Sequence, residues 1–346
     1  MAEGPIVEYE DYYEQKRVFV QEVASARYTL TEERRRRLDT VPRVIHTNAQ
    51  GLTYGEWNLL DPGQEPFRTQ SLQSHFVILP PGGRNDGHGH QNEAFFYILE
   101  GRGYELHDGQ RYDWSEGDAV VVHNDCVHWH NNADSDRRAV ALVIKAKPLW
   151  LFLGLWQQGK IGTKPTDDSR WGPREEYKIA RDPKDAAIPK VIHPSDTQWQ
   201  LTPHGRIRVL ADAGTPLRVK ALDGYLQEIA GGGRSGKRWQ MADELFYVLE
   251  GEGYDLHWEV EVEIDDQYYA RFAKEPTRWD WKAGDLVWIP QNTVFQHFNA
   301  GSRSSVRLLC ASNRIYKQLG YSRVEELENA PEYDAARSSE PAAAGD

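Results

Sequence analysis

Three histidines form the group of side chains in this chain best suited to chemistry. His88 and His90 are separated by one glycine, and His128 follows 38 residues after His90. Because successive side chains of a β-strand point to opposite faces, the His-x-His spacing places both imidazoles on one face. His128 follows the strand-like run 119–122, so a neighbouring strand can bring it to the pair. Three neutral imidazoles leave coordination positions open on a first-row divalent metal ion, as a catalytic site requires.

Composition limits the remaining possibilities. The chain has 346 residues, which is enough for two domains with complete cores, and its formal net charge is −12. This charge argues against nucleic acid and anionic membranes as partners. Two cysteines cannot build a disulfide framework, and we find no apolar signal segment and no apolar run long enough for a membrane span. We therefore expect a cytoplasmic protein.

The sequence contains a long internal repeat. Residues 93–107 (EAFFYILEGRGYELH) return as residues 243–257 (DELFYVLEGEGYDLH), at an offset of 150. Later matches, such as His130 with His297, have an offset of 167, so 17 additional residues lie between His257 and Asp280. A repeat of this length indicates a duplicated domain rather than a solenoid.

Each copy of the repeat has the pattern of a β-domain. Short runs rich in β-branched and aromatic residues are bounded by Gly, Pro, Asn or Asp, and Gly-x-Gly at 101–103 marks a tight turn. These features predict closed or double-sheet β architecture. Outside the repeats, roughly helical spacing over 8–38 predicts helix, including a solvated face at the arginine run 34–37, whereas 331–346 is typical of a disordered tail.

The motifs together resemble a known family. Gly-x-His-x-His, Leu-Glu-Gly-x-Gly and the segment His-Trp-His-Asn-Asn at 128–132 resemble the two-motif signature of cupins, and two copies resemble a bicupin. The resemblance implies an all-β fold of two double-stranded β-helix (jelly-roll) barrels with N-terminal and inter-domain helices. The domains expected are an N-terminal helical arm (1–45), an N-terminal cupin barrel with the metal site (46–147), a linker with a short helix (148–195), a C-terminal cupin barrel with a degenerate site (196–315), and a C-terminal helix and tail (316–346).

One position narrows the resemblance. Most cupins carry a glutamate ligand seven residues before the glycine of the Leu-Glu-Gly turn, and here that position is Ala94. The segment 88–94 is similar to that of the gentisate and salicylate 1,2-dioxygenases, which carry alanine there and bind Fe(II) through three histidines. The resemblance therefore implies Fe(II) as the cofactor, held by His88, His90 and His128. Glu93 is one residue away, and strand alternation should point it away from the metal.

This subgroup inserts O₂ into phenolic rings, so the resemblance implies a ring-cleaving dioxygenase acting on a small gentisate-, hydroxybenzoate- or hydroquinone-type substrate. His130 lies two residues beyond His128. On the same strand face it could exchange a proton with a phenolic hydroxyl, and it is the candidate catalytic residue. The alternative is that His130 only orients the metal ligands.

The candidate substrate pocket departs from the family. The arginine that holds the substrate carboxylate in the gentisate and salicylate enzymes corresponds to Phe96 here. Loss of a bidentate cation favours a neutral ring, in a pocket that we expect to be lined by Phe96, Tyr97, Tyr104 and Trp129. Hydroquinone-type substrates fit that pocket best.

The second copy has lost the histidine pattern. At the positions of His88, His90 and His128 it carries Arg238, Gln240 and Phe295, while Glu244 keeps the usual glutamate position. We expect no catalytic metal there. Its role is either structural, burying surface against the first barrel or across a dimer, or that of a substrate or regulatory pocket.

Two other functions are compatible with the same motifs. One is a metal-dependent cupin isomerase, lyase or thiol dioxygenase, and the other is a non-catalytic bicupin that binds a small molecule. Bicupins of this group assemble, so a homo-oligomer, dimer or tetramer, is expected.

Overall fold

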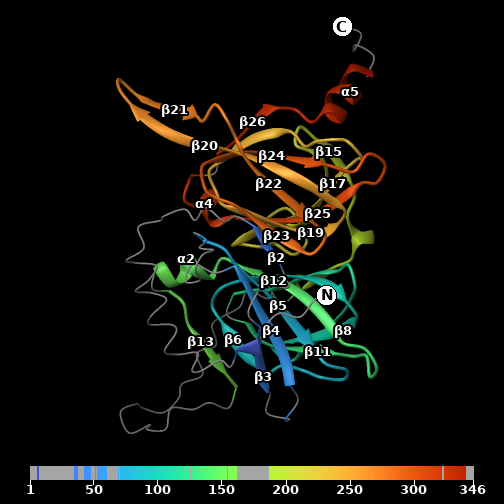
Figure 1. Ribbon diagram of the computed structural model, residues 1–346. Helices are drawn as coiled ribbons and strands as arrows, with labels where there is room; N and C mark the ends of the chain where they lie inside the picture. The colour runs from blue at the N-terminus through green and yellow to red at the C-terminus, as the bar shows by residue number, and fades with distance from the viewer. Residues whose placement is uncertain are drawn as a thin grey trace, which may run out of the picture.

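The structure is a computed structural model. It describes residues 6–7, 35–37, 43–47, 51, 53–60, 69, 71–124, 126–153, 155–161, 187–321 and 323–339. Two β-barrels are stacked on one another, with the N-terminal barrel at the bottom of Figure 1 and the C-terminal barrel at the top. The prediction of an all-β fold with two barrels is confirmed.

Two facing sheets form the N-terminal barrel. The larger has the strand order β1-β3-β4-β5-β12-β7-β10-β14, and the smaller has the order β13-β6-β11-β8-β9. The strands are β1 (Ile6–Val7), β3 (Arg43–Thr47), β4 (Thr53–Leu60), β5 (Gln73–Leu79), β6 (His88–His90), β7 (Ala94–Glu100), β8 (Arg102–His107), β9 (Gln110–Ser115), β10 (Ala119–Val122), β11 (Cys126–Asn132), β12 (Ala139–Lys145), β13 (Gln158–Lys160) and β14 (Val191–Ile192).

The C-terminal barrel repeats this plan. Its sheets have the orders β15-β16-β17-β25-β19-β23-β2 and β21-β20-β24-β18-β26, and β22 pairs with β20. The strands are β2 (Arg35–Arg37), β15 (Gln200–Thr202), β16 (Gly205–Ala211), β17 (Leu222–Ile229), β18 (Lys237–Gln240), β19 (Glu244–Glu250), β20 (Glu252–Ile264), β21 (Tyr268–Phe272), β22 (Thr277–Lys282), β23 (Asp285–Ile289), β24 (Thr293–Asn299), β25 (Val306–Asn313) and β26 (Val324–Glu328).

Helices are few and short in the described residues: α2 (Lys147–Phe152), the 3₁₀ turn η2 (Pro194–Asp196), α4 (Ile315–Gln318) and α5 (Pro331–Ser339). None of the helices that the structure describes is long and apolar enough to cross a membrane.

Two predictions at the chain ends are corrected. Arg35–Arg37, expected to be helical, form strand β2, which pairs with β23 of the C-terminal barrel. The rest of the predicted helix at 8–34 lies outside the described residues. The expected disordered tail begins with helix α5, whose first turn carries Glu332 and Asp334, charges that favour a helix N-terminus. Residues 340–346 lie outside the described residues.

Strand alternation divides the core of the protein into three parts. On β7, Phe96 and Ile98 point into the N-terminal barrel, where they pack with Trp114 and other buried residues. The intervening Phe95 and Tyr97 point the other way, into a cluster shared with residues of the C-terminal barrel. A third cluster fills the C-terminal barrel. Each barrel therefore has its own interior, and a third core joins the two.

Two buried carboxylates bind across the junction between the barrels in a reciprocal way. Glu93 accepts hydrogen bonds from the backbone N–H groups of Lys220, Ala221 and Leu222, at 2.8, 2.9 and 3.3 Å. Asp243, which stands at the position of Glu93 in the second repeat, accepts from the backbone N–H and the hydroxyl of Ser71. The expectation that Glu93 points away from the metal site agrees with this geometry.

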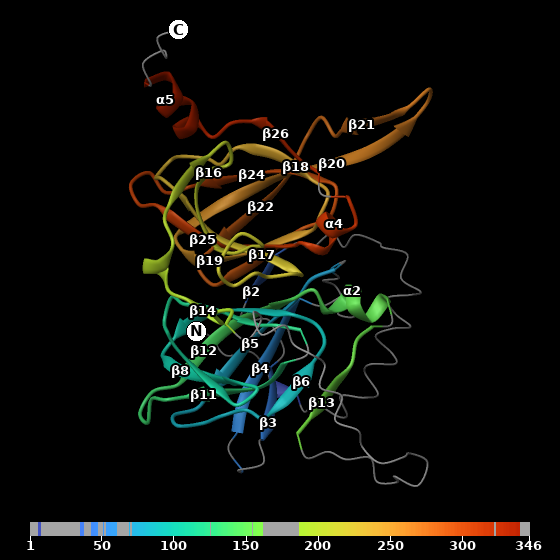
Figure 2. The same cartoon turned by 180° about the vertical axis from the view of Figure 1, so that it is seen from behind.

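The additional residues of the second repeat form a projecting hairpin. Strand β20 continues beyond its partner β24 and pairs with β21, and Figures 1 and 2 show this arm extending away from the barrel. In this arm Ile264 and Tyr268 are 70% and 78% exposed. The residues of this arm are not part of the barrel wall.

Candidate metal centre

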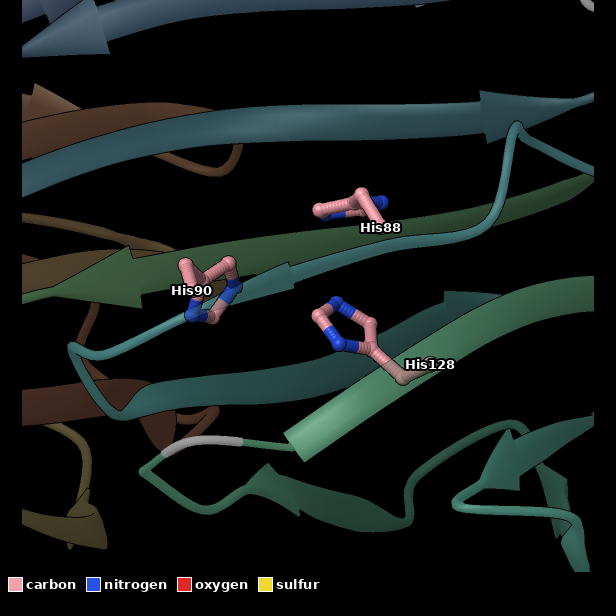
Figure 3. Close-up of side chains that lie close together, drawn as sticks. All are labelled: His88, His90 and His128. Carbon is pink, nitrogen blue, oxygen red and sulfur yellow. The ribbon is translucent and has the colours of Figure 1, made fainter. Parts of the chain in front are cut away.

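Strands β6 and β11 bring the three histidines together. They are antiparallel neighbours, and His88 stands directly opposite His128 in their register. His90 is two residues further along β6, on the same face. The ring centroid of His128 lies 4.2 Å from that of His88 and 4.8 Å from that of His90. Figure 3 shows the three rings turned toward one another. One nitrogen of each ring lies within 4.8 Å of the other two, a spacing suited to one shared metal ion.

Main-chain carbonyls fix the tautomer of each ring. In all three histidines Nδ1 hydrogen-bonds to a carbonyl oxygen two residues away, so Nδ1 carries the proton and Nε2 carries the lone pair. The pairs are His88 with Asp86 (3.0 Å), His90 with Asn92 (2.6 Å) and His128 with Cys126 (3.1 Å). This arrangement is the common way in which proteins orient a metal-binding imidazole.

The Nε2 atoms fit a metal ion. Those of His90 and His128 are buried and have no hydrogen-bond partner among the described residues. Burial holds the pKa of both rings well below the ordinary value, and the neighbouring charges of Lys145 at His90 and of His88 at His128 lower it further. The rings are therefore neutral, as metal binding requires. Unpaired buried nitrogens are costly, and a divalent cation would satisfy them.

The donor set of this barrel contains no carboxylate. The group of potential ligands found among the described residues consists of the three histidines. Ala94 occupies the position of the usual glutamate and is buried in the barrel interior. A metal ion held by three nitrogens keeps positions open for other ligands.

His130 lies beside the triad and belongs to a second group. Its ring centroid is 5.1 Å from that of His128, and its Nδ1 lies 2.5 Å from Oε2 of Glu105. Trp114 donates to the other oxygen of Glu105 at 3.0 Å. Burial alone would raise the pKa of the Glu105 carboxyl, but the rings of His130 and His107 lower it to about 2. Glu105 is thus a carboxylate that accepts the Nδ1 proton of His130.

The same group recurs in the C-terminal barrel. Asp255 accepts from His297 at 2.9 Å and from Trp281 at 2.9 Å, and His257 lies 3.2 Å from it. Sequence reasoning had matched the histidines of the repeats but missed the carboxylate between them. The signal was present, since Glu105 and Asp255 precede matched histidines at the offset of 150.

The structure places only one of the four predicted pocket aromatics near the site. Phe96 is inside the barrel, with its ring centroid 4.7 Å from that of His130. Tyr97 points into the core between the barrels. Tyr104 alternates with the inward Glu105 and stacks under Arg111 outside the barrel, 3.8 Å from ring to guanidinium.

Trp129 is likewise turned outward. It stands between His128 and His130 on β11, so alternation directs it to the opposite face, where its indole covers Gly87. The assignment of Tyr97, Tyr104 and Trp129 to the pocket is therefore corrected. The space bordered by Phe96 and His130 is about 10 Å³, enough for one water molecule and no aromatic ring.

The structure adds a cation that sequence reasoning missed. Lys145 is the last residue of β12, directly opposite Ala94 of β7, and only 9% of it is exposed. Residues opposite one another in an antiparallel pair share a face, so Lys145 points to the interior side with Ala94. The signal for it is the alternation of Ala141, Val143 and Lys145 along the strand.

In the C-terminal barrel a guanidinium stands where the metal ligand would be. Arg238 lies opposite Phe295, as His88 lies opposite His128, which confirms the repeat alignment. Its Nη2 donates to Glu244 at 3.0 Å and to the Tyr225 hydroxyl at 2.8 Å, and Tyr225 in turn donates to Glu244 at 2.8 Å. The carboxylate that binds metal in most cupins is here neutralised by an internal cation.

In the residues that the structure describes, both halves have the double-sheet barrel architecture of the cupin fold, and the N-terminal half carries a histidine triad. Residues 75–145 match the Cupin domain family. No curated protein sequence matches the chain.

Known structures are similar in fold. The salicylate 1,2-dioxygenase of Pseudaminobacter salicylatoxidans aligns with a TM-score of 0.56 at 14% identity, over 78% of this chain and 79% of that one. Its adduct with gentisate aligns at 15% identity with the same TM-score, over 79% and 77%. A mutant of the Bacillus subtilis oxalate decarboxylase aligns with a TM-score of 0.56 at 14% identity, over 86% and 80%.

Matched substitutions in the two barrels test the metal centre. We expect His90→Ala to lose one bound divalent ion per chain, because two nitrogens hold a first-row metal far more weakly than three. Gln240→Ala, at the matching position of the second barrel, should keep that ion. Metal content after equilibrium dialysis against Fe(II) or Zn(II) measures both. Equal metal content in the two variants would contradict the assignment.

Proposed function

We propose that this bicupin is a non-haem Fe(II)-dependent dioxygenase that inserts O₂ into a small phenolic ring and cleaves it. The observation that carries the proposal is the all-histidine donor set, with Ala94 in place of a carboxylate. This is the pattern of the gentisate and salicylate dioxygenases. The similarity of fold to a salicylate 1,2-dioxygenase is consistent with it, and the fold of an oxalate decarboxylase is equally similar, so the donor set carries the choice between them.

The residues of the site have separate tasks. His88, His90 and His128 would hold the ion through Nε2, and a ferrous ion bound there would supply open coordination positions and redox chemistry for O₂. His130 would transfer a proton. Because its Nδ1 proton is held by the Glu105 carboxylate, its Nε2 is the nitrogen that can accept a proton from a phenolic hydroxyl.

The shape of the site supports an approach from one side. Phe96 and His130 leave no room for a ring between them. His88 is the most exposed of the three histidines, whereas His128 is fully buried. A ring-shaped substrate would therefore reach the ion from the side of His88.

Lys145 bears on the class of substrate. It is a buried cation on the interior face, and its charge lowers the pKa of His90, so it lies within electrostatic range of the triad. Phe96 replaces the arginine of the related enzymes, and Lys145 offers a different cation for a ring carboxylate. Gentisate- and hydroxybenzoate-type rings thus remain substrates within the proposal, beside the hydroquinone type.

Oxygen consumption tests the proposal directly. After anaerobic loading with Fe(II), we expect O₂ uptake with at least one of gentisate, salicylate, hydroquinone or a hydroxynaphthoate, together with the absorbance of a ring-cleaved product. His88→Ala serves as the blank. Turnover of a substrate without O₂ uptake would favour an isomerase or lyase. Binding of the tested compounds without any turnover would favour a binding protein.

The repeat supplies a matched test of His130. We expect His130→Gln to lower kcat by about 10²–10⁴ if its ring transfers a proton. His297→Gln disrupts the corresponding group around Asp255 in the other barrel, so it should lower stability to a similar degree and leave kcat unchanged. Equal effects of the two variants on kcat would show that His130 has only a structural role.

A further variant tests the substrate class. We expect Lys145→Met to raise KM for gentisate or salicylate by about tenfold or more, since a charge-assisted hydrogen bond to the carboxylate is lost. KM for hydroquinone, which has no carboxylate, should change little. Steady-state kinetics with both rings separates the two effects, and a uniform rise in KM would contradict the role of Lys145.

A further inference from the structure

The C-terminal barrel contains a cavity that is larger than the space beside Phe96 and His130 in the N-terminal barrel. Its volume is about 190 Å³, and it lies between the end of the barrel and helix α4, with Arg238 and Tyr316 in its wall. Pockets for drug-sized ligands usually measure 300–1,000 Å³, so this one suits a molecule the size of a single ring or smaller. It belongs to the other barrel from the histidine triad.

Two hydrogen-bond donors in the cavity wall have no acceptor. The Nδ2 group of Asn313 is buried without a partner among the described residues, and only 2% of Asn313 is exposed. Its Oδ1 already accepts from the backbone N–H of Ile315 at 2.8 Å, which fixes the orientation of the amide. Nε of Arg238 is also buried without a partner. Unpaired buried donors are costly, which indicates that an acceptor is missing.

The carboxylates of the wall already accept hydrogen bonds. Asp212 accepts from the backbone N–H groups of Gly214 and Thr215, both at 2.7 Å. Glu244 binds Arg238 and Tyr225. Asp223 binds Arg314 at 2.7 Å and Lys317 at 2.6 Å. Arg323, by contrast, forms no ion pair with any residue that the structure describes and lines the same cavity. The wall therefore offers donors without an acceptor and one cation without an ion pair among the described residues, while its carboxylates already have hydrogen-bond donors.

We propose that this cavity binds a small organic carboxylate. Arg323 and Asn313 receive the two carboxylate oxygens, since charge-assisted hydrogen bonds are the strong ones. Val209, Ala211 and Val324 form an apolar wall for the body of the ligand. The site is independent of the metal centre and of the proposed oxygenase activity.

Calorimetric titration of the full chain tests the proposal. The probes are acetate, succinate and benzoate, with benzamide as the uncharged match for benzoate. We expect at least one carboxylate to bind at one site per chain, and benzamide to bind at least tenfold more weakly than benzoate if benzoate is that ligand. His90→Ala, which alters only the metal centre, should bind the carboxylate like the unchanged protein.

Two variants in the wall localise the binding. Asn313→Asp keeps the oxygen that accepts from Ile315 but replaces the donor with a negative charge, and we expect it to weaken binding by about tenfold or more. Arg323 is exposed at the rim of the cavity, so its substitution does not put folding at risk. We expect Arg323→Gln to weaken carboxylate binding as well.

Three results would overturn the proposal. The first is that no carboxylate binds, which would leave ordered water as the occupant. The second is an unchanged affinity in Arg323→Gln, and the third is loss of binding in His90→Ala. The last result would move the carboxylate to the metal centre.

Discussion

The antiparallel register of β6 and β11 is the constraint on which the metal centre depends. It sets His88 opposite His128 and leaves His90 two residues away on the same face. A shift of one residue would turn His128 to the outer face and bring Trp129 or Val127 inward. Three features hold the register: the backbone pairing of the strands, the burial of Cys126 in the barrel core, and the hydrogen bond of His130 to Glu105. The same strand pair thus fixes both the three histidines of the candidate metal site and the neighbouring His130.

The two barrels solve the same electrostatic problem in opposite ways. A buried carboxylate needs a cation or several hydrogen-bond donors, whereas neutral imidazoles bring no charge that must be compensated. In the C-terminal barrel Glu244 is present and Arg238 supplies the positive charge. In the N-terminal barrel alanine stands in place of the carboxylate, and three imidazoles face one another instead. Each barrel has a buried histidine–carboxylate group, around Glu105 in the first and Asp255 in the second. Because this group is present with and without the histidine triad, we assign it to the fold rather than to metal binding.

Strand periodicity made much of this structure predictable from the sequence. The His-x-His pair, the repeat and the outward direction of Glu93 all follow from alternation. The misplaced aromatics were errors in applying the same rule, because Tyr97 and Trp129 each alternate with a residue assigned to the interior. Strand β2 was not predictable in this way. Its pairing with β23 is a tertiary contact across about 250 residues, and local helical spacing carries no information about it.

The carboxylate contacts between the barrels give the C-terminal barrel a role at the metal site. Residues 90–94 contain the candidate ligand His90, the carbonyl of Asn92 that orients its ring, and Glu93. Glu93 is bound by three backbone N–H groups of the C-terminal barrel, and Asn92 is held by Trp156 through its side chain at 3.0 Å. The turn that orients His90 is therefore clamped from the other barrel. A second barrel that has lost its own histidines still contributes to the first, because it restricts the motion of the segment on which the first depends.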